Sequence, residues 1–152
     1  MNKGNKLYIA YGSNLNLAQM ANRCPTARVV GSGAIKDYRL LFRGEHGGAV
    51  ATVEPFPNGS VPVLVWEIGP ADEAALDRYE GWPFLYRKEI MSIELNGKKT
   101  DAMVYIMNEG GGGNYRPLGS PGAYYYNIIR EGYRDAGFST DVLRKATSDS
   151  VE

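Results

Sequence analysis

The stretch "LYIAYGSNL", residues 7–15, decides the fold. Its first five residues alternate with a period of two, which predicts a β-strand. Gly12 then breaks the strand, because glycine can take a positive φ and turn the chain without a Cβ clash. Ser13 to Leu15 follow and carry no ionisable side chain. A strand that ends in such a turn can offer a ligand only backbone amides, a hydroxyl and an amide group.

The residues after the turn predict what those amides do. We expect a short helix over residues 14–23, ended before Pro25. The first amides of a helix have no intrahelical partner, so those of Ser13, Asn14 and Leu15 are expected to be unpaired. Amides in this position suit a carboxylate or the oxygen of a tetrahedral intermediate. The alternative is a plain strand-to-helix connection in which Asn14 only caps the helix.

Further along the chain, strand and helix patterns alternate. Strands are expected at residues 38–44, 49–55 and 61–68, and in a hairpin that turns at Asn96-Gly97. Helices are expected at residues 70–80, at 124–136 and over a short segment from 141. About six strands and four scattered helices indicate an α+β fold with a curled, barrel-like mixed sheet. We expect one domain over residues 1–152, with flexible ends at about 1–5 and 147–152.

Composition excludes several classes of protein. The 152 residues include 17 basic and 17 acidic side chains, so no net field attracts nucleic acid or an anionic membrane. No apolar run reaches transmembrane length, and "MNKGNK" lacks the apolar core of a signal peptide. The single cysteine, Cys24, cannot form an internal disulfide and favours a reducing, cytoplasmic location. The sequence has no paired cysteines or clustered histidines for a metal.

A carboxylate is therefore the candidate base. The only histidine, His46, lies in a separate glycine-rich loop, which disfavours serine–histidine chemistry. Glu80 falls on the last turn of its expected helix, where the negative end of the helix dipole disfavours an anion. Burial beside Tyr79 and Trp82 would also raise its pKa, to about 6–7. Such a glutamate can act as general base and then acid. The alternative is a solvated glutamate at a helix end.

Taken in order, the motifs of the chain resemble the γ-glutamylcyclotransferase-like family, also called the AIG2-like family. They are "AYGSNL", "MANRCPTA", "DYRLLF", "AVATVEP", "VPVLVWEI", "LDRYEGWP" and "PGAYYYNIIREGYRDAG". The resemblance covers nearly all of residues 7–146 and is closest to the small bacterial members. The Tyr-Gly-Ser-Asn turn and the Glu-Gly pair at the end of the central helix are the family's functional marks.

The resemblance implies a small mixed β-barrel flanked by helices, with the turn lining a cavity. The matching positions are Tyr11, Gly12, Ser13 and Asn14 for the substrate-binding loop, Glu80 for the catalytic glutamate and Tyr125 for a pocket tyrosine. Because Gly122 follows Pro121 where family members carry serine, Tyr124 could take the place of Tyr125. We expect residues 11–15 to bind the substrate mainly through their backbone, Leu15 included.

The resemblance also implies a reaction. Glu80 would take a proton from the α-ammonium of a γ-glutamyl amide, and the amine would attack its own γ-carbonyl. This step closes the 5-oxoproline ring and releases a free amine. Ring closure within one bound molecule depends mostly on positioning. No metal or cofactor is expected, and the expected partner is a small-molecule γ-glutamyl substrate. The other function left open is a non-catalytic small-molecule-binding protein of the same fold.

One further segment has the composition of a flexible loop. The glycine run Gly110–Gly113 lacks side chains that could hold it, so we expect a mobile loop at the cavity mouth or a plain loop elsewhere. It lacks the Gly-Lys-Ser/Thr ending of a P-loop, which disfavours nucleotide binding. Neither the leaving amine nor the oligomeric state follows from these motifs.

Overall fold

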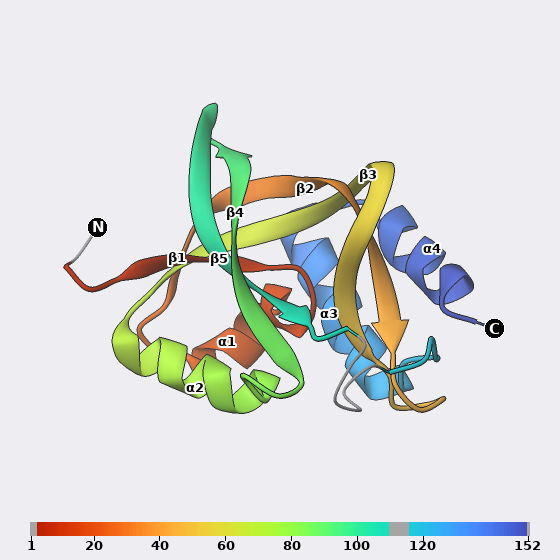
Figure 1. The fold of residues 1–152 in the computed structure, drawn as a ribbon. Helices are drawn as coiled ribbons and strands as arrows, with labels where there is room; N and C mark the ends of the chain where they lie inside the picture. Colours follow the sequence, from red (N-terminus) through yellow and green to blue (C-terminus); the bar gives the residue numbers. More distant parts are fainter. Residues whose placement is uncertain (1–2, 110–115, 152) are drawn as a thin grey trace.

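One curled sheet and the helices around it make up the fold (Figure 1). The computed structural model describes residues 3–109 and 116–151, and the loop expected at Gly110–Gly113, at the cavity mouth or elsewhere, lies outside them. The elements are, in chain order, β1 (Lys6–Ala10), the 3-10 turn η1 (Ser13–Leu15), α1 (Leu17–Arg23), β2 (Arg28–Arg43), β3 (Val50–Ile68), α2 (Pro70–Glu80), β4 (Tyr86–Leu95), β5 (Lys98–Met107), α3 (Ala123–Ala136) and α4 (Asp141–Asp149).

The sheet is mixed, as the sequence predicted. Its strand order is β2-β3-β1-β5-β4. β1 is antiparallel to β3 but parallel to β5, and β4 and β5 form the expected hairpin. The sheet curls until its edge strands approach: a Cβ on Gly33 of β2 would lie 2.9 Å from the carbonyl oxygen of Glu94 in β4. The fold is therefore α+β with a barrel-like mixed sheet.

The region predicted as two strands, residues 49–55 and 61–68, is one long strand, β3. Its register with β2 shifts between Tyr38↔Pro55 and Lys36↔Ser60, so residues 56–59 bulge out of the ladder. The Asp37 side chain accepts a hydrogen bond from the Asn58 amide across this bulge, at 3.0 Å. The proline- and glycine-rich segment thus interrupts the pairing without ending the strand. This continuity reduces the expected six strands to five among the described residues.

The helix predicted over residues 14–23 is wrong in its first part. Ser13 to Leu15 form the separate turn η1, and α1 begins only at Leu17. Asn16, and not Asn14, caps α1: its side-chain oxygen accepts from the Gln19 amide at 3.1 Å. The chain thus turns twice, which lets η1 pack against α3 while α1 runs beside α2.

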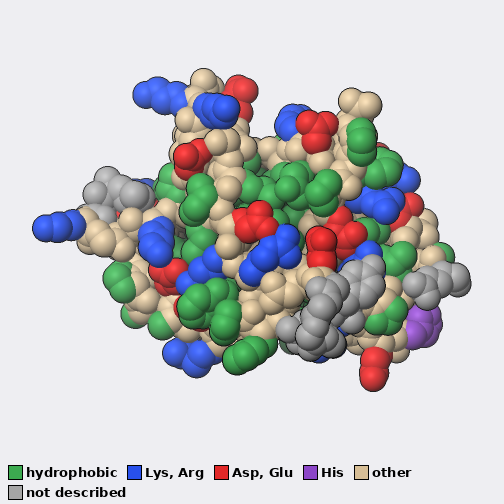
Figure 2. Space-filling model, viewed as in Figure 1, with side chains coloured by type: hydrophobic (Ala, Val, Ile, Leu, Met, Phe, Trp, Pro, Cys, Tyr) green, Lys and Arg blue, Asp and Glu red, His purple; other side chains and the backbone are tan. Residues whose placement is uncertain are grey.

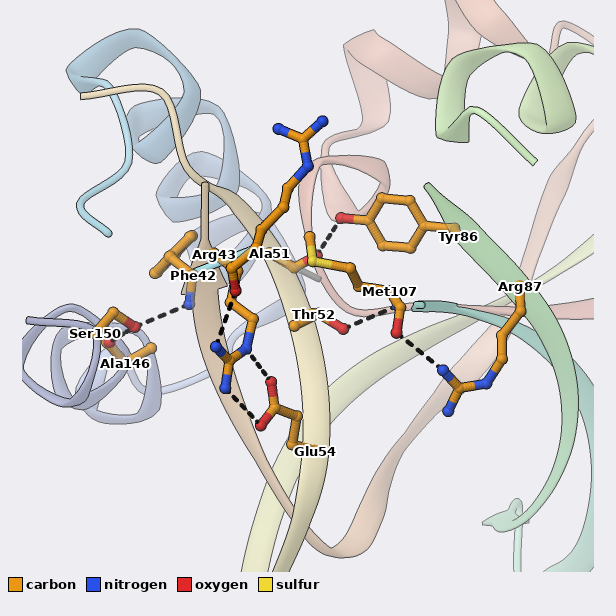
Figure 3. Close-up of polar contacts among 11 residues, drawn as sticks. Phe42, Arg43, Ala51, Thr52, Glu54, Tyr86, Arg87, Met107, Ala146 and Ser150 are labelled. Atoms are coloured by element: carbon orange, nitrogen blue, oxygen red, sulfur yellow. Dashed lines mark hydrogen bonds and ion pairs between the residues drawn. The ribbon is translucent and has the colours of Figure 1, made fainter. Parts of the chain in front are cut away.

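The other helices follow their expected positions closely. α2 ends at Glu80, and Gly81 takes the left-handed conformation that stops it, with a φ of 66°. α4 is longer than expected, reaching Asp149, and so extends into the end that the sequence predicted as flexible. Ser150 behind it is fully buried, and its hydroxyl accepts a hydrogen bond from the Phe42 amide of β2 at 2.8 Å (Figure 3).

The surface carries charges of both signs. Figure 2 shows acidic and basic side chains interspersed with hydrophobic ones over the face in view, as the balanced count of 17 and 17 requires. None of the helices in the described part of the chain is long and apolar enough to cross a membrane.

Candidate active site

A cavity of about 210 Å³ opens where β1 ends. It is smaller than the ~300–1,000 Å³ typical of sites for drug-sized ligands, and so suits a metabolite-sized group. Residues of β1, the η1 turn, α2, β4, β5, α3 and the start of β3 surround it. They are Tyr8, Ile9, Tyr11, Gly12, Ser13, Asn14, Val50, Ala51, Tyr79, Glu80, Leu85, Tyr86, Tyr105 and Tyr125.

The turn after β1 enters this cavity but differs in detail from the prediction. The Leu15 amide is paired, because it donates to the Gly12 carbonyl at 3.0 Å in the 3-10 turn. Within residues 3–109 and 116–151, the amides of Ser13 and Asn14 have no acceptor. The Leu15 side chain is fully buried in the core and does not line the cavity, since it packs against Gly132 of α3. Leu15 is therefore a packing residue here.

Gly12 is needed for space and not for a positive φ. Its φ is −124°, which corrects the expectation from the sequence. A Cβ at this position would lie 3.3 Å from the Ala51 Cβ and 3.8 Å from the Tyr125 hydroxyl. Glycine thus lets the turn approach the opposite wall of the cavity.

Glu80 brings the carboxylate to the cavity. It is the last residue of α2, it is partly buried, and its carboxylate has no hydrogen-bond or ion-pair partner in the described part of the chain. Burial raises its pKa to about 7, and the positive charge of Arg23 nearby acts in the opposite direction. Tyr79 lines the same cavity, but Trp82 does not; its ring instead faces the Lys88 ammonium at 4.1 Å. Burial is thus the main cause of the raised pKa, and Trp82 is not part of the cavity wall beside Glu80.

Six tyrosines dominate the walls, and sequence reasoning had singled out two of them for binding. Burial raises the pKa of the phenols of Tyr8, Tyr11, Tyr86, Tyr105 and Tyr125 well above the ordinary value, so they remain neutral hydrogen-bond donors. Most of these side chains come from strands that are distant in sequence. The late cluster "AYYYN" did not reveal them, because only one of its three tyrosines, Tyr125, lines the cavity.

Two phenols keep a proton for a ligand. The Tyr125 hydroxyl accepts from the Ala51 amide at 3.0 Å, and the Tyr8 hydroxyl accepts from the Asn14 side chain at 2.9 Å. Neither hydroxyl proton has an acceptor among the residues that the structure describes. Tyr124, the alternative to Tyr125, is 80% exposed and lies outside the cavity.

The wall formed by β3 is held by polar contacts on both sides (Figure 3). The Tyr86 hydroxyl donates to the Ala51 carbonyl at 2.5 Å, and the Thr52 hydroxyl accepts from the Met107 amide at 3.1 Å. Two residues further along β3, Glu54 forms a two-bond ion pair with Arg43 of β2. These contacts connect β3 to β2, β4 and β5 and fix the position of Ala51 in the cavity.

Known proteins are similar to this chain in sequence and in fold. The family model described as "Gamma-glutamyl cyclotransferase, AIG2-like" matches residues 8–125. A gamma-glutamylcyclotransferase from Bos taurus is 26% identical over an alignment of 151 residues. The alignment covers 93% of this chain and 77% of that protein. A solved structure of a gamma-glutamyl cyclotransferase has a TM-score of 0.78 at 25% identity, covering 97% of this chain and 88% of the other. The crystal structure of an uncharacterized protein from Homo sapiens shares the fold, with a TM-score of 0.79 at 24% identity and coverages of 99% and 89%.

The chain therefore belongs to the γ-glutamyl cyclotransferase, AIG2-like family. The matched range begins at Tyr8 and ends at Tyr125, so it spans the turn, Glu80 and both phenols that keep a free proton. Homologues named gamma-glutamylcyclotransferase support an enzyme of this family.

Proposed function

We propose that the protein releases 5-oxoproline and a free amine from a γ-glutamyl amide. The observation that carries the proposal is the Glu80 carboxylate, which lines the cavity, has no partner among the residues that the structure describes, and has a pKa of about 7. An unpaired acid of this kind is ready to exchange a proton with a bound ligand. A substrate that carries its own amine nucleophile would need only such a proton exchange from the protein.

The pKa of Glu80 suits the first step. Each unit by which the pKa of the ammonium exceeds that of the base costs ~1.4 kcal/mol in the proton transfer. Relative to an ordinary glutamate at ~4.3, a base near 7 lowers this free-energy cost by nearly three units, or roughly 4 kcal/mol. Burial of Glu80 therefore lowers the thermodynamic barrier to forming the free amine, while about half of the carboxyl groups stay ionised at pH 7.

The free amine then attacks the γ-carbonyl of the same molecule. A C–N bond forms as the ring closes, and the amide C–N bond breaks when Glu80 returns its proton to the leaving nitrogen. The unpaired amides of Ser13 and Asn14 would hold the oxygen of the tetrahedral intermediate. The free phenol protons of Tyr8 and Tyr125 would serve as donors to the substrate α-carboxylate. The ring nitrogen gives up its second proton to Glu80, ionised again by then, and Glu80 passes it to the released amine. Both protons that leave the attacking nitrogen thus end on the leaving amine, and water is not consumed.

The test is direct. The protein is incubated with γ-glutamyl amides that differ only in the leaving amine, and 5-oxoproline is measured by mass spectrometry. Formation of 5-oxoproline from at least one amide, lost in Glu80→Gln, supports the proposal. Saturable binding of the same amides by the wild-type protein without any 5-oxoproline would instead identify a small-molecule-binding protein of this fold.

A further inference from the structure

Arg23, the last residue of α1, lies behind the cavity and does not line it. One nitrogen of its guanidinium donates to the Asn14 side-chain oxygen, and another donates to the Gln19 side chain at 3.0 Å. The flat group also stacks on the Tyr79 ring, with its central carbon 3.4 Å from the ring centroid. Arg23 thus touches two residues that do line the cavity.

Both residues that Arg23 contacts are hydrogen-bonded in turn to side chains that line the cavity. The Asn14 amide nitrogen donates to the Tyr8 hydroxyl at 2.9 Å, and the Tyr79 hydroxyl is hydrogen-bonded to the Ser13 hydroxyl at 2.7 Å. A guanidinium can only donate, so it forces the oxygen of the Asn14 amide toward itself and the nitrogen toward Tyr8. Because the Tyr8 oxygen then accepts, its proton remains available to a ligand.

Arg23 also supplies the charge that faces Glu80. The other ionisable groups that line the cavity are phenols: Tyr8 from β1, Tyr11 just after it, Tyr79 from α2, Tyr86 from β4, Tyr105 from β5 and Tyr125 from α3. Among the described residues, Arg23 is the charged group that opposes the effect of burial on the Glu80 pKa. Both roles of Arg23, orientation and charge, act on the same cavity.

We propose that Arg23 is a positioning residue of this site, which orients Asn14 and Tyr79 against the turn and holds a positive charge beside Glu80. The catalytic part of this inference rests on the proposed function. Its electrostatic part does not, because the titration of Glu80 can be measured without a substrate.

The experiment compares a charge-retaining variant with neutral ones. In Arg23→Gln and Arg23→Met, the Glu80 carboxyl, followed by NMR in the free protein, should titrate higher by on the order of 0.5–1 unit. The acidic limb of kcat/KM should move upward by the same amount. In Arg23→Lys the titration should stay near that of the wild type, but KM should rise several-fold, because a lysine cannot stack on Tyr79 and bond Asn14 at once. Arg144→Met is the control, because Arg144 is an exposed residue of α4. This variant should change neither the titration of Glu80 nor KM.

Each part of the proposal has its own contrary result. Unchanged Glu80 titration in a folded neutral variant overturns the role of the charge; two neutral variants are made so that one unfolded protein does not decide the matter. Wild-type KM and kcat in Arg23→Lys overturn the role in orientation. If no γ-glutamyl amide yields 5-oxoproline, the proposed function fails, and the NMR titration and the side-chain amide signals of Asn14 still test what Arg23 does.

Discussion

At the scale of single residues, Glu80 combines a proposed catalytic role with a buried position that disfavours its ionised form. Replacing it by glutamine keeps the shape but removes proton transfer, so turnover should fall by on the order of 100-fold or more. The measurement is kcat for 5-oxoproline release by Glu80→Gln. Glu131→Gln, on the exposed side of α3, is the matched control and should keep full activity. Wild-type turnover in Glu80→Gln would mean that Glu80 only ends the helix and takes no part in catalysis.

The same substitution should make the protein more stable at alkaline pH. The pKa of Glu80 is about 7 in the folded protein, against ~4.3 when unfolded. The folded state therefore binds this proton more tightly, and the associated stability is present below pH ~4.3 and lost as pH rises through 7. At pH 8, Glu80→Gln should raise the free energy of unfolding by on the order of 1–3 kcal/mol. Urea denaturation at pH 8 and pH 5 measures it; an equal difference at both values would contradict the argument.

At the scale of elements, the turn between β1 and η1 acts through its backbone. Valine at position 12 would push against Ala51 and Tyr125, which a Cβ would meet at 3.3 Å and 3.8 Å. Ser13→Ala removes one hydrogen bond to Tyr79, worth ~1 kcal/mol. Gly12→Val should therefore raise KM much more than Ser13→Ala does. Steady-state kinetics with one γ-glutamyl amide compares the KM values of the two variants. A normal KM in Gly12→Val would show that the cavity can hold a valine side chain at position 12 without loss of substrate binding.

At the scale of the whole molecule, the C-terminal helix closes the fold onto the edge of the sheet. The Ser150 hydroxyl accepts from the Phe42 amide and donates to the Ala146 carbonyl (Figure 3). Ser150→Ala leaves a buried amide of β2 without a partner, which should lower the free energy of unfolding by ~1–3 kcal/mol. Urea denaturation measures the loss against Ser148→Ala, an exposed serine of the same helix. Equal stability of both variants would mean that water replaces the lost hydroxyl.

Local rules account for the parts of the fold that were predictable. The alternation of β1, the Asn96-Gly97 hairpin and the Gly81 stop after α2 depend on residues that are neighbours in the chain. The same rules misplaced the start of α1, because a 3-10 turn and a helix cap at Asn16 share the composition of one continuous helix. They also divided β3 at its prolines, since the sequence does not reveal that β2 continues alongside the bulge.

The sequence by itself determined the turn, the position of Glu80 at a helix end and the family resemblance, because each is written in a short run of residues. Only the tertiary structure decided which tyrosines surround Glu80, that Leu15 packs in the core, and that Arg23 reaches Asn14 and Tyr79. These groups come from different elements, and the strand order β2-β3-β1-β5-β4 brings them together. That order depends on pairing between distant segments, and the burial it creates sets the pKa of the carboxylate.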